Sequence, residues 1–217
     1  MSNSSLVTYT KLSPNNSGVR TQPISRITPH CYCGQVTVER MGNGFAKPEV
    51  EASSNYGIGL DGTIGMFVPE DTRSWCSSSA SNDQRAITIE CASDTTEPCT
   101  FNSIVYERLI ALTVDICKRN GKNKVVWIPN KDEALAYAVK SNEILITVHR
   151  WFSSVRSCPG EWLYSRLAEF ACAVNNQLVD KPLYRVQVGA FHNKRYAEDY
   201  AEAIRKAGFP AFVTQVE

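Results

Sequence analysis

The chain has 217 residues, of which 43% are hydrophobic and 21% charged, a composition typical of a folded globular protein rather than a disordered one. Its net charge of +1 gives no general basic surface, so we expect no nucleic-acid partner. No apolar run approaches the roughly 20 residues that span a bilayer, and residues 1–28 lack the apolar stretch of a secretory signal, so we expect neither a membrane partner nor a signal peptide.

The chain has eight cysteines. In a chain of this length without a secretory signal, free or metal-bound thiols are a better expectation than a disulfide framework. We expect most of the eight to be small core residues, because free cysteine is among the most buried residue types. They are Cys31, Cys33, Cys76, Cys91, Cys99, Cys117, Cys158 and Cys172.

The first third of the chain predicts a hairpin preceded by short segments. Residues 1–23 are rich in Ser, Thr, Asn and Pro and read as a polar lead-in. Residues 36–41 fit either a short helix or a strand. From 55 to 68, apolar residues alternate on both sides of Asp61-Gly62, a turn signal, which predicts a β-hairpin.

Strands and helices alternate over the middle of the chain. Three short apolar runs are predicted as buried strands, at 86–91, 125–128 and 144–148. Apolar residues at helical spacing predict helices over 101–118, with Asn102 or Ser103 as N-cap, and over 162–178. This alternation predicts an α/β domain over 24–178, with a central mixed β-sheet flanked by helices.

The end of the chain has a different pattern. Residues 179–183 form a short polar linker. A strand is predicted over 184–188, a helix over 193–207 and a second strand over 209–216. A β-α-β segment over 184–217 is too small for a complete domain.

Three residues could bind a metal ion. His30 and His149 each lie at the end of an apolar segment, and Cys158 stands beside Pro159 and Gly160. Two imidazoles and a thiolate from the ends of different strands suit a tetrahedral zinc site whose fourth position is open to water. The alternative is that all three are buried structural residues, because no C-x-x-C or H-E-x-x-H motif fixes the site.

A second, local cluster is His30-Cys31-Tyr32-Cys33. Alternation along a strand places His30 and Tyr32 on one face and Cys31 and Cys33 on the other. We therefore expect Cys31 and Cys33 not to share a metal with His30.

Two charged residues are candidates for catalysis. Glu90 ends an otherwise apolar strand, where a carboxylate is unfavourable unless it is paired or functional. A salt bridge is the alternative explanation. Arg156 lies two residues before Cys158, where it would place a cation near the metal, and its alternative is a solvated loop charge.

Four motifs occur in order along the chain, at 53–64, 73–75, 82–90 and 149–160. Together they resemble the type 2 N-acetylmuramoyl-L-alanine amidases, a family that shares its fold with peptidoglycan recognition proteins and includes many phage endolysins. The resemblance covers roughly residues 24–178.

The resemblance implies a zinc ion held by His30, His149 and Cys158. It implies that Tyr56 hydrogen-bonds near the metal-bound water or the reacting carbonyl and that Glu90 handles protons. Arg156 stands where many relatives have an oxyanion-stabilising lysine; arginine keeps the charge but cannot act as an acid. Independently of the resemblance, we expect Trp75 and Trp151 either to line the substrate cleft or to belong to the core.

The tail resembles the first half of a SPOR domain, a family that binds peptidoglycan glycan strands. The similarity lies in residues 184–191 and 207–212. With half of the usual domain present, three readings stay open: a truncated domain, pairing with a second copy of the chain, or a remnant.

These features together predict a zinc-dependent amidase that cuts the amide bond between N-acetylmuramic acid and the first L-alanine of peptidoglycan. The alternatives are a non-catalytic peptidoglycan-recognition module and a zinc peptidase acting on the stem peptide. Without a signal peptide, we expect synthesis in the cytoplasm and action on the cell wall after phage lysis or export, as a phage or prophage endolysin or a host autolysin.

Overall fold

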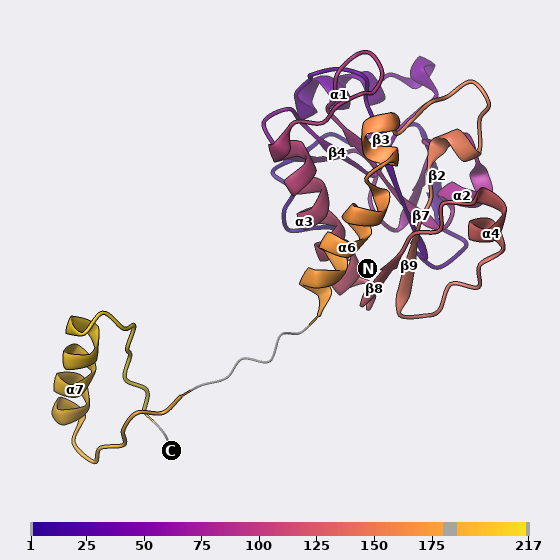
Figure 1. Ribbon diagram of the computed structural model, residues 1–217. Coiled ribbons are helices and arrows are strands. Elements are labelled where there is room, and N and C mark those ends of the chain that lie inside the picture. The colour runs from indigo at the N-terminus through magenta and orange to yellow at the C-terminus, as the bar shows by residue number, and fades with distance from the viewer. Residues whose placement is uncertain (1, 180–185, 216–217) are drawn as a thin grey trace. The chain divides into compact units, whose positions relative to one another are not determined.

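A computed structural model describes residues 2–179 and 186–215 of the chain (Figure 1). The chain divides into two compact units, residues 1–180 and 181–217. None of the helices in these described ranges is both long and apolar enough to cross a membrane.

The first unit is built on a seven-stranded sheet with the order β1-β5-β4-β7-β3-β9-β8. Neighbouring strands are parallel except for the β4–β5 hairpin, so the sheet is mixed, as predicted. A separate antiparallel pair joins β2 and β6. The strands are β1 (Tyr9–Thr10), β2 (Asn16–Val19), β3 (Arg26–Cys31), β4 (Tyr56–Ile58), β5 (Ile64–Met66), β6 (Thr72–Ser74), β7 (Ala86–Cys91), β8 (Lys124–Val126) and β9 (Glu143–Ile146).

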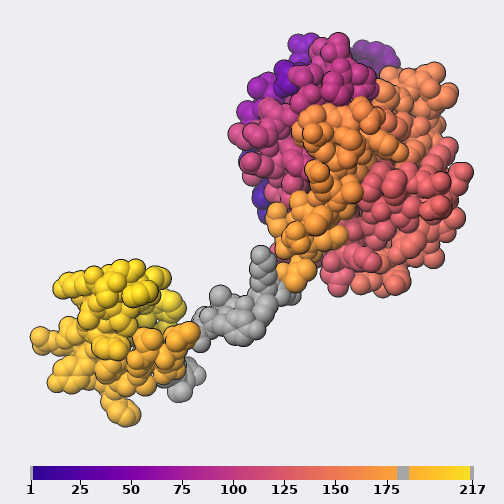
Figure 2. Space-filling model, viewed as in Figure 1, coloured from indigo at the N-terminus to yellow at the C-terminus, as the bar shows by residue number. Residues whose placement is uncertain are grey.

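Helices flank this sheet. Helix α6 packs against α3 on one side and β8 on the other, so its orange surface lies between theirs in Figure 2. The α-helices of the unit are α1 (Val38–Phe45), α2 (Ala80–Asp83), α3 (Ser103–Arg119), α4 (Lys131–Ala136), α5 (Glu161–Tyr164) and α6 (Leu167–Leu178), with 3-10 turns η1 (Pro48–Val50) and η2 (His149–Trp151).

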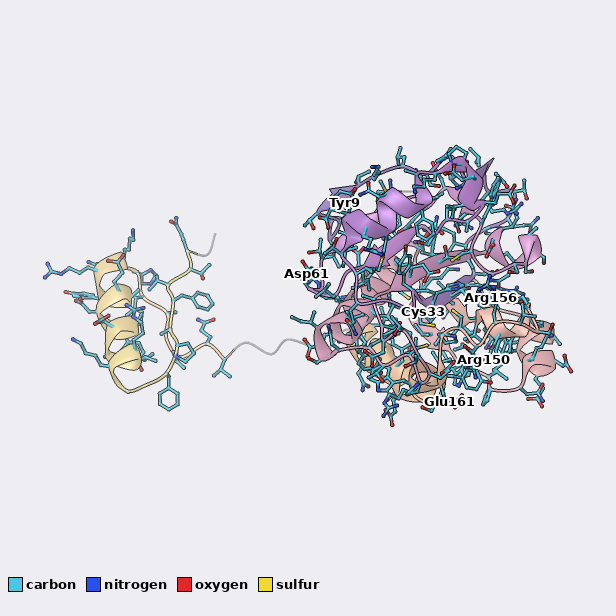
Figure 3. The ribbon with its side chains drawn as sticks, turned by 90° about the horizontal axis from the view of Figure 1, so that it is seen from above. Tyr9, Cys33, Asp61, Arg150, Arg156 and Glu161 are labelled. Carbon is cyan, nitrogen blue, oxygen red and sulfur yellow. The ribbon has the colours of Figure 1, made fainter. Side chains whose placement is uncertain are left out.

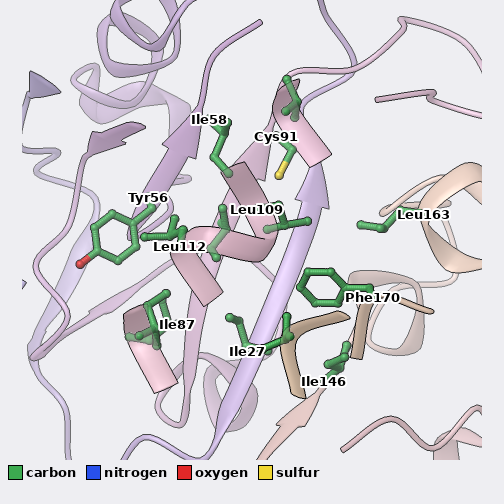
Figure 4. Close-up of a cluster of buried hydrophobic side chains, with 14 of the residues drawn as sticks. Ile27, Tyr56, Ile58, Ile87, Cys91, Leu109, Leu112, Ile146, Leu163 and Phe170 are labelled. Atoms are coloured by element: carbon green, nitrogen blue, oxygen red, sulfur yellow. The ribbon is translucent and has the colours of Figure 1, made fainter. Parts of the chain in front are cut away.

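The two faces of the sheet differ in chemistry because side chains alternate along each strand. One face of β3, β7 and β9 carries Ile27, Ile87 and Ile146, which pack with Leu112 of α3 and Phe170 of α6 in the main core (Figure 4). Burying each such side chain contributes about 1.5–3 kcal/mol. The opposite face is polar, and it is there that the functional candidates lie.

Most elements predicted from the sequence are confirmed. The hairpin over 55–68 is β4–β5, the strand over 86–91 is β7, and the helix predicted over 101–118 is α3, capped by Asn102 through a bond from Val105 N. The ambiguous 36–41 segment begins helix α1, with Thr37 as its cap.

The helix predicted over 162–178 is interrupted. Its first turn is α5, and α6 starts only at Leu167. At the break, the Ser165 hydroxyl donates to the carbonyls of Glu161 and Trp162. Such local side-chain bonds compete with regular helix geometry, which apolar periodicity does not reveal.

The prediction of a separate lead-in over 1–23 is wrong. Strand β1 extends the main sheet, and β2 pairs with β6. The Arg20 side chain is buried and donates to the carbonyl of Glu70 and to Oδ1 of Asn55. These strands, of two and four residues, are too short for a detectable alternation.

The second unit contains one regular element, α7 (Lys194–Lys206), which confirms the predicted helix. Asn193 caps it by accepting from Arg195 N, and the Phe191 ring packs on Tyr200 at 5.4 Å. Residues 184, 185 and 216 of the predicted strands lie outside the described residues. Over 186–190 and 209–215 no strand forms, because no hydrogen-bonded partner strand is present there.

Candidate metal centre and catalytic residues

His30 and Glu90 are brought together by strand register. They are paired residues on the adjacent parallel strands β3 and β7, near the carboxyl end of each strand. Side chains of paired residues point to the same face, so both lie on the polar face of the sheet. His30 Nδ1 is 3.9 Å from Glu90 Oε1.

His149 and Cys158 complete a three-residue cluster with His30. His149 begins η2, three residues after the end of β9, and Cys158 lies in the loop before α5. Cys158 Sγ is 3.2 Å from His30 Nδ1, and the two imidazole rings are 5.2 Å apart between centroids. One potential ligand atom from each of the three residues lies within 4.8 Å of the others.

This donor set fits zinc. In a tetrahedral site with Zn–N of about 2.0 Å and Zn–S of about 2.3 Å, ligand nitrogen and sulfur are roughly 3.5 Å apart, close to the separation seen between His30 and Cys158. Burial holds the pKa of His30 well below its usual value and lowers that of His149 to about 4. Both rings are thus neutral near pH 7, which is the form that binds metals.

Glu90 is a proton-accepting group beside this cluster. Burial raises its pKa to about 7, against the opposing effects of a contact with Cys76 and the charge of Arg156. Cys76 Sγ lies 3.7 Å from Glu90 Oε1, while Oε2 is buried without a hydrogen-bond partner among the described residues. A carboxylate with this pKa can both take and return a proton near neutrality.

Arg156 lies in the exposed loop that leads to Cys158 (Figure 3). Burial is the main cause of the lowered pKa of His149, and the positive charge of Arg156 is the second cause. The same charge lowers the pKa of Glu90 and so favours its ionised form. Arg156 is therefore within electrostatic reach of both residues. Arg150 of the same region is held instead by Glu161, with Nη1 and Oε2 3.1 Å apart.

A buried polar network supports the cluster from below. The hydroxyls of Thr28 and Thr147 are 2.8 Å apart, and Asn82 donates to Thr28 and accepts from Thr147. The network joins β3, which carries His30, to the segment after β9, which leads to His149, so it fixes these two segments relative to each other.

The structure does not bring Tyr56 to the cluster, which corrects its predicted role. Tyr56 is paired with Ile89, the residue before Glu90, so its side chain leaves the opposite face of the sheet. Its buried hydroxyl donates to Glu70 Oε1 at 2.6 Å and accepts from Ser4 N at 3.0 Å. The motif placed Tyr56 correctly in the strand, but register sends the ring to the other face.

Trp151 also does not line a cleft. It is 7% exposed and stacks on Trp127, with ring centroids 5.3 Å apart, inside the core. Trp75 is partly exposed, and its indole nitrogen donates to Ser17 Oγ at 2.7 Å. Its neighbour Cys76 contacts Glu90, so Trp75 stays a candidate for the rim of the site.

Two contacts to the cluster were not foreseen from the sequence, those of Cys76 and Ser78. Ser78 Oγ lies 2.8 Å from His149 Nε2. Ser78 belongs to a Ser/Asn-rich loop, and Cys76 is the residue just before that loop. Nothing in the sequence pattern of such a loop distinguishes one of its residues as a contact to the site.

A surface pocket of about 520 Å³ opens beside β3. Its wall begins at Tyr32, two residues after His30, and includes the cation Arg40 of α1. The remaining lining residues are Cys33, Gly34, Gln35, Val36, Thr37, Leu60 and Thr95.

Three solved structures serve as examples of proteins that share this fold. A mutant endolysin from Bacillus subtilis has a TM-score of 0.54 and 14% identity, covering 76% of this chain and 97% of its own. A selenomethionine derivative of AmpD has a TM-score of 0.50 and 18% identity, with coverages of 82% and 99%. Drosophila peptidoglycan recognition protein SD has a TM-score of 0.52 and 16% identity, with coverages of 73% and 88%.

Family models cover most of the sequence. Residues 20–161 match the N-acetylmuramoyl-L-alanine amidase family, and residues 180–217 match the SPOR domain. No curated protein sequence is a match to the chain. Both kinds of domain bind peptidoglycan, which makes the bacterial cell wall the place of action. With more than half of its length matched, the chain belongs to the N-acetylmuramoyl-L-alanine amidase family.

Proposed function

We propose that the protein is a zinc-dependent amidase that hydrolyses the amide bond between N-acetylmuramic acid and L-alanine in peptidoglycan. The observation that carries this proposal is the convergence of His30, His149 and Cys158, with ligand atoms within 4.8 Å of one another, beside the carboxylate of Glu90. Two imidazoles and one thiol are suitable ligands for a hydrolytic zinc ion, and the carboxylate beside them is a suitable base.

Glu90 is the proton-transfer residue in this proposal. A zinc ion held by His30, His149 and Cys158 would polarise the scissile carbonyl and lower the pKa of a bound water to about 7. Glu90 accepts the proton of the attacking water, and its own raised pKa lets it return that proton to the leaving amine. The contact with Cys76 holds the carboxylate in place.

Arg156 is the candidate for stabilising the oxyanion. The positive charge of its guanidinium acts on both His149 and Glu90. Fixed positive charge near a developing oxyanion lowers the barrier to carbonyl addition. Tyr56 takes no part, because its hydroxyl is bound to Glu70.

The pocket beside β3 is the candidate binding site for the muramyl-peptide. It starts two residues from His30, and Arg40 in its wall suits a carboxylate of the stem peptide. We propose that the SPOR segment adds affinity for glycan strands. The endolysin or autolysin setting and any self-association of the second unit stay predictions.

A peptidoglycan-binding module without activity is the main alternative. Cys158 argues against it, because a module that only binds the wall has no need of the full metal-ligand set. A peptidase acting on the stem peptide is the other alternative, and product analysis separates it, since an amidase leaves muramic acid bare and frees the amino group of L-alanine.

The test combines metal content, wall lysis and product analysis on the full chain. We expect bound zinc and loss of turbidity of purified cell walls, with lysis abolished and the zinc content lowered by about one ion per chain in Cys158→Ser. Glu90→Gln should keep the metal but lose lysis. Cys172→Ser, at an exposed cysteine of α6, is the matched control and should behave as wild type. Lysis by metal-free wild type, or lysis that survives in Cys158→Ser, would contradict the proposal.

A further inference from the structure

A second group of metal-ligating side chains lies close to the candidate zinc centre, formed by the thiols of Cys31, Cys33 and Cys99. The Sγ atoms of Cys31 and Cys33 are 3.7 Å apart, and those of Cys33 and Cys99 are 3.9 Å apart. All three sulfur atoms lie within 4.8 Å of one another. The amidase mechanism uses none of these thiols.

The spacing of the three sulfur atoms is that of ligands around one ion. Two thiolates on a tetrahedral zinc with Zn–S of about 2.3 Å are roughly 3.8 Å apart, whereas the sulfurs of a disulfide are about 2.05 Å apart. Both measured separations match the first value. All three residues are free cysteines in this structure.

The fold brings these thiols together from separate segments. Cys31 ends β3, Cys33 lies in the loop that follows, and Cys99 lies in the loop between β7 and α3. His30 groups instead with His149 and Cys158, or with Cys76 and Glu90. The thiol cluster therefore has its own set of ligands, and it adjoins the catalytic set where the Cys31 thiol contacts that of Cys158.

We propose that Cys31, Cys33 and Cys99 bind a second, thiophilic metal ion of the zinc class. Each thiol releases its proton to solvent as the ion binds, and three thiolates leave one position open on a tetrahedral ion. Cys33 is exposed and lines the surface pocket beside β3, so the ion has a route of entry. Soft sulfur ligands select zinc, cadmium or copper(I) over magnesium or calcium.

The second ion would brace the loop that carries the catalytic thiol. Cys99 packs directly against Gly160, where a Cβ would lie 2.5 Å from the Cys99 Cβ. Gly160 is two residues from Cys158. Holding Cys99 to Cys31 and Cys33 therefore fixes the surface on which the Cys158 loop rests.

The experiment is a metal count on the full chain, purified under reductant, saturated with zinc and freed of loosely held metal. We expect about two zinc ions per chain in wild type and about one in the Cys33→Ser, Cys99→Ser double variant. Cys158→Ser should keep about one zinc ion per chain. The variant that combines Cys33→Ser, Cys99→Ser and Cys158→Ser should keep none. Cys172→Ser, the exposed cysteine outside both clusters, should retain two.

A cadmium titration supplies a readout that does not depend on activity or on the catalytic site. The ultraviolet thiolate-to-cadmium absorption should persist in Cys158→Ser and fall strongly in the double variant, with circular dichroism showing that each variant is folded. Equal zinc counts in wild type and the double variant would overturn the proposal. So would a Cys33–Cys99 disulfide found by peptide mapping of protein whose thiols were blocked at lysis. Neither result would bear on the catalytic zinc, which Cys158→Ser reports.

Discussion

His30 and Glu90 are register partners on two parallel strands, and this pairing places a candidate metal ligand 3.9 Å from a buried carboxylate. Burial lowers the pKa of His30 and raises that of Glu90. The polar face thus holds a neutral imidazole beside an acid that titrates near neutrality. A bound cation would favour the ionised form of Glu90, so binding of the metal would be accompanied by release of a proton.

The first prediction concerns the pH dependence of activity. Glu90 must be ionised to accept a proton, so the rate should rise as pH increases through its pKa, which is about 7 without metal and lower with a cation beside it. Glu90→Gln should lose most activity, by about 100-fold or more, and its remaining rate should no longer rise with pH in this range. Initial rates of wall lysis between acid and neutral pH, measured on zinc-loaded protein, would show it. An unchanged acid limb in Glu90→Gln would assign it to another group.

The same carboxyl should influence the stability of the metal-free protein. Its pKa is higher in the folded than in the unfolded chain, so the folded state binds more protons between about pH 4 and 7. The free energy of unfolding should then decrease as pH rises through this window. Urea denaturation of chelator-treated wild type and Glu90→Gln would test this, and parallel pH profiles for the two proteins would contradict it.

Ser78 is expected to position His149. Its hydroxyl lies 2.8 Å from His149 Nε2, and a bond from this ring nitrogen fixes the tautomer with a lone pair on Nδ1. Ser78→Ala should weaken zinc binding by about 10- to 100-fold and leave thermal stability of the metal-free protein nearly unchanged, because the residue is exposed. Competition with a chromophoric chelator measures this affinity. Ser81→Ala, in the neighbouring helix α2, is a control that should retain wild-type affinity.

Substitution of Tyr56 tests whether this residue has a structural or a catalytic role. Tyr56→Phe removes the bond to Glu70 and leaves that buried carboxylate with one donor fewer, so the protein should lose about 1–3 kcal/mol of stability. Its rate on cell walls at a temperature where it stays folded should match wild type. Chemical denaturation and lysis assays on the same preparation decide the matter, and a large loss of rate without loss of stability would restore the catalytic role.

The sequence was a good guide where chemistry and local periodicity coincide. Residues 86–91 form a buried strand in which Ile87 and Ile89 fill the core face, and Asn102 caps α3 because its side chain accepts from Val105 N. The metal-ligand candidates His30, His149 and Cys158 were identified from ends of apolar segments and from family motifs. The structure brings these three residues together.

Register and non-local packing were not accessible from the sequence. Tyr56 and Glu90 lie on neighbouring strands, but a one-residue offset in pairing sends them to opposite faces of the sheet. Trp151 is a core residue because Trp127, far away in the sequence, stacks on it. The approach of Cys99 to Cys33 likewise joins two loops that are 66 residues apart in the sequence, so the spacing of the cysteines along the chain does not indicate it.

The last prediction concerns the glycine that follows the Cys158 loop. Gly160 has φ of 80° and ψ of 157°, a region that residues with a Cβ avoid, and an added Cβ would lie 2.7 Å from the Pro98 carbonyl oxygen as well as against Cys99. Gly160→Ala should therefore lower the free energy of unfolding by about 3 kcal/mol or more and weaken zinc binding through Cys158. Gly121→Ala is the matched control, because Gly121 also has positive φ, at 66°, but has no atom within 4 Å of the added Cβ. It should lose only about 1–2 kcal/mol and bind zinc normally. Denaturation and zinc titration of both variants give the comparison, and equal losses would show that the contact with Cys99 and Pro98 is not what requires glycine.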